Sequence, residues 1–335
     1  MPLFRTRSSA LLQKLMPRRQ LLVRPQISSS TKKARPTALA VATATAAAAA
    51  AAAAASAAVV TVCDEDRLER WNDRWATGRV AWHREKPNEI LVKNYDAFMR
   101  PTDGQKPGAA VRVLVPLCGK TVDMPYLAQK GHEVVGVDGV EAAVWQLQRD
   151  SWLKFETFQA EPSAESSGRR PGFLPAPTFE KRRSGYVFKT DTLGTGYYLD
   201  KKAIKWFRDT RKRISVVVSD FLFLAPGDIG MFDRVWDRGA LVALRPEDRE
   251  EYVSTCDSVL EPGGKILLAT LVYDQNAKQG PPYSIPLAEV QRLYGGKLGY
   301  VIETLSSVDA REEYQTKRFK NLAQPTQKRN TKNAG

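Results

Sequence analysis

Short apolar runs alternate with segments of helical periodicity between about residues 111 and 274. The stretch VRVLVPLCGKTVDMPYLAQKGHEVVGVD, from Val111 to Asp138, predicts a strand, a tight turn, a helix and a second strand. The same patterns predict strands at Ile214 to Asp220, Phe232 to Asp237 and Lys265 to Asp274, and helices at Val140 to Phe158 and Pro246 to Leu260. Because apolar, β-branched strands separated by helices are typical of parallel strands buried on both faces, we predict a doubly wound α/β sheet.

A tryptophan-rich segment precedes this alternating region. Leu68, Trp71 and Trp75 stand at helical spacing, the pattern breaks at Gly78, and it resumes near Asn88. We therefore expect a helix, a loop and a second helix before the first strand of the sheet.

Two segments interrupt the alternation. Residues Ala160 to Gly185 are rich in Pro, Ser, Gly and Arg and have no periodicity, so we expect a flexible insertion. The basic run KKAIKWFRDTRKR, Lys201 to Arg213, is predicted to be the solvated face of a helix, with phosphate contact as an alternative. One domain would then span residues 65–320, followed by a disordered basic tail at residues 321–335.

The formal net charge of +14 is distributed unevenly along the chain. The first 62 residues contain nine of the 51 Lys and Arg residues and no acid, which leaves 42 bases against 37 acids, about +5, in the body. A charge of this size does not favour binding to a nucleic-acid duplex.

Residues 1–62 form a basic leader that is rich in Ser and Ala and ends in an Ala-rich run. This composition is typical of an organelle transit peptide, so we expect import into a mitochondrion or plastid. A membrane anchor and a mistaken translation start are the alternatives. In each case the leader is expected to stay outside the fold, and no stable membrane association of the body is expected.

Cysteine and histidine are few and scattered. The three cysteines, Cys63, Cys118 and Cys256, show no CxxC spacing, and the two histidines are His83 and His132. We therefore expect neither a disulfide framework nor a metal site.

The first turn of the predicted sheet, PLCGKT, contains one glycine, Gly119, and Asp138 follows nineteen residues later at the end of the second strand. A carboxylate there can reach the ribose diol of NAD or of S-adenosylmethionine. A pyrophosphate needs the close backbone approach that three spaced glycines allow, whereas the amino-acid tail of S-adenosylmethionine needs less clearance. An ordinary turn without a ligand remains an alternative for these two residues alone.

Later strands favour S-adenosylmethionine. VVVSDF places Ser219 and Asp220 at the end of the third strand, where an adenine edge would lie. SVLEPGGKILLATL is an arrangement common in the fifth-strand region of S-adenosylmethionine methyltransferases. We predict that the turn at Gly119 holds the methionine side of this cofactor.

Four segments together resemble the thiopurine S-methyltransferase family of class I S-adenosylmethionine-dependent methyltransferases, from about Leu68 to about Asp309. They are RWNDRWATGRVAWH, VPLCGKTVDMPYLAQKGHEVVGVD, FDRVWDRGALVALRPEDREEY and LVYDQNAKQGPPYSIPLAEVQRLYG. The resemblance implies a Rossmann-like, mostly parallel, seven-stranded sheet, whose last antiparallel edge strand is not recognisable in this sequence. We expect a monomer, and a cytoplasmic location, as is typical of the family, is the alternative to import.

The resemblance also implies roles for individual residues, with the segment from Trp71 to Trp82 folded over the cofactor as a lid. The residues implied to bind S-adenosylmethionine are Trp71, Trp75, Leu117, Gly119, Asp138, Ser219, Asp220 and Arg238. Trp82 and Arg311 would face the acceptor, and Arg238 would lie between cofactor and acceptor.

Three positions differ from the animal members of this family. Asp138 is one methylene shorter than their glutamate, and Trp82 replaces a phenylalanine. Tyr314 stands in place of an arginine, although Arg311 could reach the same space. These differences preserve the chemistry of cofactor binding and leave the acceptor open.

The predicted reaction is in-line transfer of a methyl group to the sulfur of a small aromatic or heterocyclic thiol. Arg238 could favour the thiolate electrostatically. Asp237 could assist the departure of a proton or, equally, cap the helix that follows.

Three alternatives remain. The acceptor could be another thiol, a halide or a metalloid, or the chain could bind the cofactor without catalysis. GPPY, from Gly280 to Tyr283, resembles the Asn-Pro-Pro-Tyr loop of base-amine methyltransferases. A nucleic-acid acceptor is nevertheless disfavoured, because that loop follows the fourth strand and this one follows the fifth.

Overall fold

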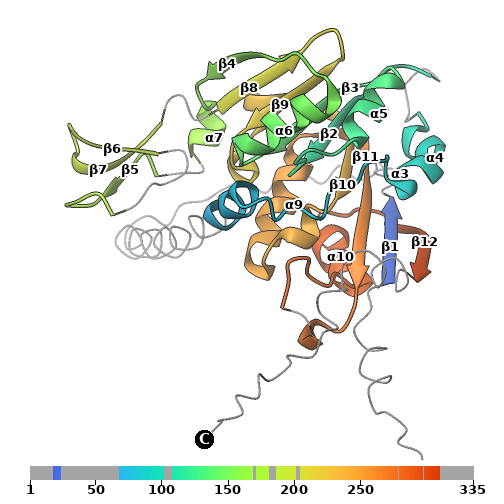
Figure 1. Cartoon of the computed structure of the whole chain (residues 1–335). Coiled ribbons are helices and arrows are strands. Elements are labelled where there is room, and N and C mark those ends of the chain that lie inside the picture. The colour runs from blue at the N-terminus through green and yellow to red at the C-terminus, as the bar shows by residue number, and fades with distance from the viewer. Residues whose placement is uncertain are drawn as a thin grey trace, which may run out of the picture.

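The computed structural model describes residues 18–23, 68–101, 108–168, 171–180, 186–200, 204–277, 279–296 and 298–309. Its centre is a nine-stranded sheet (Figure 1). In spatial order the strands are β12 (Glu303–Asp309), β1 (Arg18–Val23), β11 (Leu260–Val272), β10 (Phe232–Arg238), β2 (Arg112–Pro116), β3 (Glu133–Asp138), β9 (Ile214–Val218), β8 (Ile204–Asp209) and β4 (Glu156–Ala160).

Five neighbouring strands, β11, β10, β2, β3 and β9, run parallel to one another. The chain proceeds outward from β2 through β3 to β9 on one side and continues with β10 and β11 on the other, so the strand order reverses between β2 and β10. This arrangement confirms the predicted doubly wound, mostly parallel α/β fold. The sheet has nine strands rather than seven, and antiparallel pairing occurs on both flanks.

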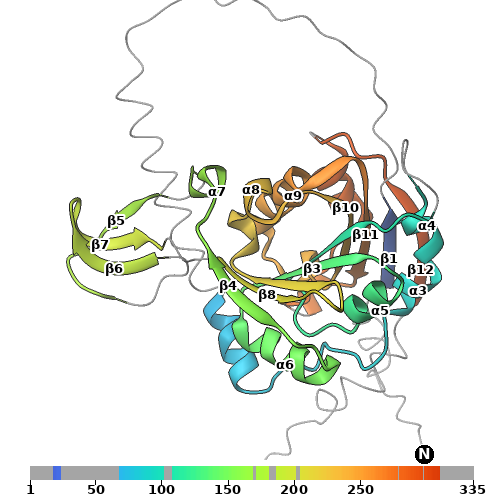
Figure 2. The ribbon, with the colours of Figure 1, turned by 90° about the horizontal axis from the view of Figure 1, so that it is seen from above.

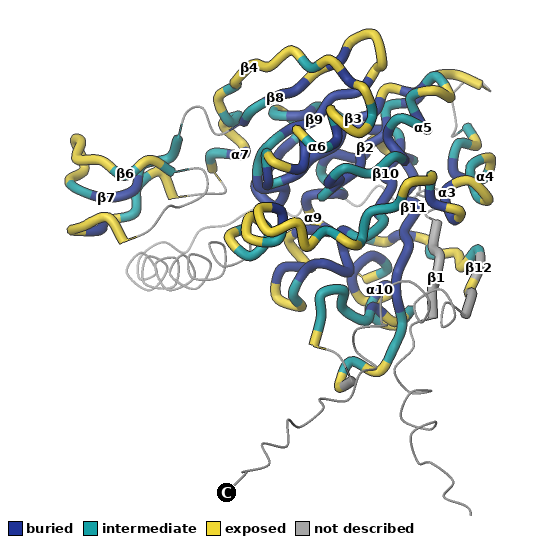
Figure 3. Tube along the Cα trace, viewed as in Figure 1, coloured by how far each residue is buried: buried dark blue, intermediate teal, exposed yellow. Residues whose placement is uncertain are grey.

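Helices cover both faces of the sheet (Figures 2 and 3). Besides residues 68–76, the α-helices are α3 (Glu89–Lys93), α4 (Tyr95–Met99), α5 (Asp123–Gln129), α6 (Glu141–Ser151), α7 (Ala164–Gly168), α8 (Pro226–Ile229), α9 (Arg249–Ser258) and α10 (Leu287–Val290). There are also short 3₁₀ helices, η1 (Phe221–Phe223), η2 (Leu241–Ala243), η3 (Pro246–Asp248) and η4 (Gln275–Ala277), and one π-helical segment, η5 (Gln291–Gly295). Leu91, Met124 and Leu147 of α3, α5 and α6 pack in one core. Tyr252 of α9 and Val290 of α10 pack in the other.

The helix predicted at Val140 to Phe158 is shorter than expected. It ends at Ser151, because Trp152 has a left-handed backbone with φ of 53°, and β4 follows. The basic run from Lys201 to Arg213 was predicted as a helix face, which is wrong. Its centre forms β8, where Trp206 and Phe207 are buried and Lys205 forms an ion pair with Glu141 at 2.6 Å.

The insertion from Ala160 to Gly185 was expected to be flexible, and parts of its described residues have regular structure. It contains α7 and β5 (Phe173–Pro175), and β5 joins β6 (Tyr186–Asp191) and β7 (Gly194–Leu199) in a three-stranded sheet. Figure 2 shows this small sheet standing apart from the main one. Buried Tyr197 packs against Phe179 and Phe188, with ring centroids 6.3 and 5.1 Å away, so an aromatic cluster stabilises it.

The leader also differs from expectation. Residues Arg18–Val23 form β1, which pairs antiparallel with β11 and with β12. These six residues are therefore part of the fold, and β12 supplies the edge strand that the sequence did not reveal. The rest of the leader and the tail at residues 321–335 lie outside the described residues. Among the described helices, none combines the length and apolarity needed to span a membrane.

Candidate functional site

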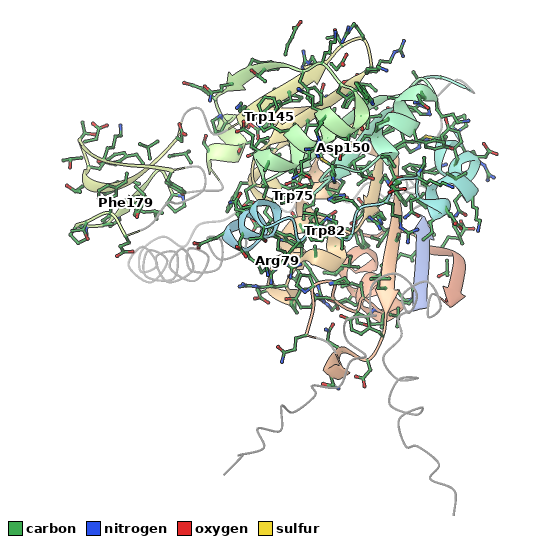
Figure 4. All side chains as sticks on the ribbon, in the orientation of Figure 1. Trp75, Arg79, Trp82, Trp145, Asp150 and Phe179 are labelled. Carbon is green, nitrogen blue, oxygen red and sulfur yellow. The ribbon has the colours of Figure 1, made fainter. Side chains whose placement is uncertain are left out.

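Four strand ends meet where the strand order reverses. Leu117, Asp138, Asp220 and Arg238, which end or follow β2, β3, β9 and β10, line one cavity of about 550 Å³. Residues 68–83, here called the tryptophan segment, form another part of its wall. Figure 4 shows Trp75, Arg79 and Trp82 gathered beside the sheet. A cavity of this size at a reversal of strand order is typical of a ligand site in α/β proteins.

The turn after β2 has left-handed backbone at two positions, with φ of 47° at Leu117 and 54° at Gly119. The Gly119 N–H donates to Oδ2 of Asp138 at 2.8 Å, so the turn is fastened to β3. A methyl group on Gly119 would lie 2.5 Å from Cε1 of His83, so any side chain would have to displace that ring. In this structure the missing side chain therefore makes room for the tryptophan segment.

Asp138 is buried at the end of β3 and lines the cavity. Its Oδ1 accepts from the Val140 N–H at 2.9 Å, and its Oδ2 accepts from Gly119. Burial raises the pKa of Asp138 to about 6, although both hydrogen bonds act in the opposite direction. Each oxygen retains a further lone pair, so the carboxylate can accept hydroxyl hydrogen bonds from a ligand.

The tryptophan segment presents an aromatic surface to the cavity. The ring centroid of Trp82 lies 5.4 Å from that of Trp71 and 6.0 Å from that of Trp75, both edge to face. His83 packs at 5.0 Å from Trp75. Trp75 also packs with Val140 and with Ala143 of α6, which anchors the segment to the body. The structure thus brings the three predicted tryptophans together around one ligand space.

Arg238 joins the tryptophan segment to the sheet. Its Nη1 and Nη2 both donate to the main-chain oxygen of Trp82, each at 3.2 Å. The guanidinium lines the cavity beside Gly239 and Trp82. A fixed positive charge is therefore present where the cavity passes from the strand ends to the aromatic wall.

Several cavity residues were missed by sequence reasoning, and Asp123 is the most constrained of them. It is buried, and its Oδ1 and Oδ2 accept from the Asn88 N–H at 2.6 Å and from Nε1 of Trp236 at 2.9 Å. In the sequence Asp123 reads as an ordinary acid in the first turn of a helix. Arg74, Arg79, Thr121 and Thr270 also line the cavity, and nothing in their spacing indicated it.

The acids of the cavity are already engaged by the protein. Both oxygens of Asp123 and of Asp138 accept hydrogen bonds, and Oδ1 of Asp220 accepts from the Leu222 N–H at 3.2 Å. Within the part of the chain that the structure describes, no group of three His, Cys, Asp or Glu residues could hold a metal ion.

Three predicted site residues are not among those that line the cavity. Asp237 is buried behind it, where it accepts from the Tyr252 hydroxyl at 2.7 Å and from the Leu241 N–H at 3.2 Å. These two hydrogen bonds fasten Asp237 to α9 and to η2. The main-chain N–H of Ser219 donates to the main-chain oxygen of Asp138 at 3.2 Å. Arg311 lies outside the described residues.

Comparison with known families decides the class of the protein. The family model for thiopurine S-methyltransferase (TPMT) matches residues 66–170 and 196–330. The chain belongs to the thiopurine S-methyltransferase family. The thiopurine S-methyltransferase of Rattus norvegicus is 32% identical over 73% of this chain and 83% of the relative. That of Oryctolagus cuniculus is 33% identical over 73% of this chain and 82% of the relative.

Two solved structures illustrate the similarity beyond the family. Burkholderia thailandensis 1,6-didemethyltoxoflavin-N1-methyltransferase covers 68% of this chain and 73% of its own at 15% identity, with a TM-score of 0.38. Magnesium protoporphyrin IX methyltransferase from Synechocystis PCC 6803 aligns with 70% of this chain over 86% of its own length, also at 15% identity and with a TM-score of 0.38.

Family membership confirms the resemblance seen in the sequence. The protein is a methyltransferase with a Rossmann-like fold, and its cofactor is S-adenosylmethionine. The cavity fits this cofactor, because it combines a carboxylate that can accept from a diol with an aromatic wall. The thiopurine S-methyltransferase model does not match residues 171–195, which include β5, β6 and the start of β7.

Proposed function

We propose that the protein transfers a methyl group from S-adenosylmethionine to the sulfur of a small aromatic or heterocyclic thiol. The observation that carries this proposal is a guanidinium, that of Arg238, in an aromatic-walled cavity. Trp82, Pro281 and Pro282 line the same cavity and provide flat apolar surfaces for a ring. The positive charge favours the thiolate form of a sulfur acceptor. A halide or a metalloid oxyanion would leave these apolar walls without a contact.

The cofactor-binding roles follow from position in the cavity. Asp138 would accept from the ribose hydroxyls, and Asp220 would lie at the adenine, with Ser219 supporting the same strand end. The other residues proposed to contact the cofactor are Trp71, Trp75, Leu117, Gly119 and Arg238. Trp82 would face the acceptor, as would Arg311.

The proposed mechanism depends on alignment and on charge. S-adenosylmethionine supplies a methyl group bonded to a positively charged sulfur. Holding the acceptor sulfur in line inside the cavity can contribute about 7–11 kcal/mol when the geometry is good. Arg238 would stabilise the acceptor as its thiolate, and the tryptophan segment, as part of the cavity wall, would shield the reacting atoms from water. Because the Asp237 carboxylate already binds Tyr252 and Leu241, the acceptor is expected to bind as the thiolate without a protein base.

Turnover of 6-mercaptopurine by the protein and by an Arg238→Ala variant tests this function. We expect kcat/KM to fall by about a hundredfold in the variant, because a fixed charge at the reacting sulfur is lost. Arg238→Lys should retain more activity, since it keeps the charge. A protein that binds S-adenosylhomocysteine but methylates no thiol would be a non-catalytic scaffold. A preference for iodide or selenite would indicate a halide or metalloid methyltransferase.

We further propose that the protein acts as a monomer on a small-molecule acceptor and binds no nucleic acid. The acidic and basic residues of the body nearly balance, which supports this proposal. Light scattering would measure the mass, and filter binding at moderate salt would reveal any affinity for DNA or RNA.

We also propose that residues 1–62 direct import into a mitochondrion or plastid, on the strength of their basic, acid-free composition. A fluorescent protein fused to these residues should then accumulate in the organelle. Diffuse cytoplasmic fluorescence would instead support the alternative location.

A further inference from the structure

Arg74 contributes a positively charged side chain to the wall of the cavity. It lies on helix 68–76, is half-buried and lines the cavity. Its guanidinium carbon is 5.1 Å from the ring centroid of Trp71 and 6.0 Å from that of Trp82. Stacking on indole rings fixes the plane of a guanidinium and leaves its N–H groups available at the edge.

The surroundings of Arg74 do not neutralise it. The neighbouring carboxylate of Asp73 forms an ion pair with Arg79. Among the described residues, no carboxylate lies within ion-pair distance of Arg74. Burial, followed by the like charges of Arg70 and Arg79, lowers the pKa of the Arg74 guanidinium, and the charge of Asp73 offsets this only in part. An anion placed beside Arg74 would therefore be strongly favoured.

The three acids that line the cavity in the described part of the chain, Asp123, Asp138 and Asp220, accept hydrogen bonds from other groups, and none of them forms an ion pair with Arg74. Asp123 binds Asn88 and Trp236, and Asp138 binds Gly119 and Val140. The counter-charge that Arg74 lacks is thus expected to arrive with a ligand.

We propose that Arg74 is a specificity-determining residue that binds a carboxylate carried by the methyl acceptor, in the space between Trp71 and Trp82. This inference rests on the proposed function and deepens it, since it names the acceptor as an aromatic thiol with an acidic group. The planar guanidinium can donate two parallel hydrogen bonds to a carboxylate. The amino-acid tail of the cofactor has the same chemistry, so the test separates the two sources. Arg74 lies between Trp71, proposed to contact the cofactor, and Trp82, proposed to face the acceptor, and we assign its free edge to the Trp82 side.

The test compares 4-mercaptobenzoate with thiophenol, which differ by the carboxylate. In Arg74→Gln we expect the ratio of kcat/KM for the two thiols to fall by about tenfold, mainly through KM for 4-mercaptobenzoate. Arg74→Lys should recover part of the ratio, because it restores the charge. Arg149→Gln, which removes an exposed charge on α6, is the matched control and should leave the ratio unchanged.

Calorimetry provides a readout that does not depend on turnover. The Kd of 4-mercaptobenzoate for protein loaded with S-adenosylhomocysteine should weaken about tenfold in Arg74→Gln. An unchanged ratio and an unchanged Kd for this thiol would overturn the proposal. A Kd that weakens for S-adenosylhomocysteine instead would also overturn it and assign the carboxylate to the cofactor. If the protein methylates neither thiol, the proposed function fails, and the Kd of 4-mercaptobenzoate still decides the role of Arg74.

Discussion

Asp138 and Asp237 are both buried at strand ends, and burial raises the pKa of each carboxyl to about 6, yet they face different partners. Asp138 lines the cavity, whereas Asp237 binds the Tyr252 hydroxyl behind it. The position of Asp138 is predictable from sequence, because the rhythm of strands and helices fixes where the second strand ends. The partner of Asp237 is not, because only the packing of α9 brings Tyr252 to the end of β10.

Cofactor affinity is predicted to depend on pH through Asp138. Its two oxygens accept hydroxyl hydrogen bonds most strongly when the carboxyl is ionised, and burial raises its pKa to about 6. The Kd for S-adenosylhomocysteine should therefore be constant above about pH 7 and weaken as the pH falls through 6. Calorimetry between pH 5 and 8 would measure this. In Asp138→Asn, binding should be weaker throughout and should lose this pH dependence; retention of the dependence would exclude Asp138 as its source.

Asp237 is predicted to stabilise the folded protein more at acid pH than at neutral pH, whereas an acid in a salt bridge stabilises it more at neutral pH. Its folded pKa of about 6 lies above the ordinary 3.8, so its contribution to stability is fully present below pH 3.8 and is lost as the pH rises through 6. Relative to Asp237→Asn, the unfolding free energy of the protein should fall by on the order of 2 kcal/mol between pH 4 and pH 7.

Urea unfolding at four pH values would measure this difference. Asp191→Asn serves as the control of opposite sign, because a hydrogen bond from Lys189 lowers the pKa of the exposed Asp191. A difference for Asp237→Asn that stays constant with pH would contradict the prediction.

At the scale of elements, burial on both faces decided which strands could be predicted. The parallel strands β2, β3, β9, β10 and β11 appear in the sequence as apolar runs, because helices cover them on both sides. The flanking strands β8 and β4 do not. In β8 the buried Trp206 and Phe207 stand among charged residues, one of which pairs with α6. In β4 four of five positions are exposed, so no periodic pattern exists to be recognised.

Arg234 is predicted to be the main polar link between β10 and α4. It is fully buried, and its Nε and Nη2 donate to the main-chain oxygens of Phe98 at 2.7 Å and Arg100 at 2.8 Å, at the C-terminal end of the helix. Arg234→Met keeps the bulk but leaves these oxygens without that donor. We expect a loss of on the order of 3 kcal/mol in unfolding free energy.

Lys93→Met on α3 is the matched control for this substitution. Lys93 is exposed and pairs only with Glu89 one turn away, so its loss should change stability by about 0.5 kcal/mol or less. Chemical denaturation would compare the two variants. Equal effects would show that Arg234 has no special role at the end of α4.

For the whole molecule, the doubly wound centre of the sheet could be predicted and its edges could not. The reversal beside β2, and with it the location of the site, follows from the order of strands and helices along the chain. β1 comes from a leader whose composition indicates a targeting segment, and its short apolar core carries no periodic signal. In the site, Arg74, His83 and Asp123 were missed because single polar residues on helices and loops most often lie at the surface.

Removal of residues 1–62 is predicted to destabilise the sheet. Among the described strands, β12 pairs with β1 alone, so the truncation would leave β12 without a neighbour and would expose the edge of β11 that faces away from β10. We expect the Tm to fall by several degrees, as a loss of a few kcal/mol does in a domain of this size. A chain that lacks only residues 2–15 retains β1 and should melt like the full protein. Equal Tm values for the two truncations would mean that β1 contributes nothing to stability.

The clustering of indoles around one cavity also has a practical consequence. Four of the seven tryptophans, Trp71, Trp75, Trp82 and Trp236, line the cavity, whereas Trp145 and Trp152 are exposed on and beside α6. Any compound that fills the cavity changes the surroundings of several fluorophores at once, while the exposed ones report a constant background. The protein therefore carries an intrinsic optical signal, and its emission spectrum can rank candidate acceptors without labels or turnover.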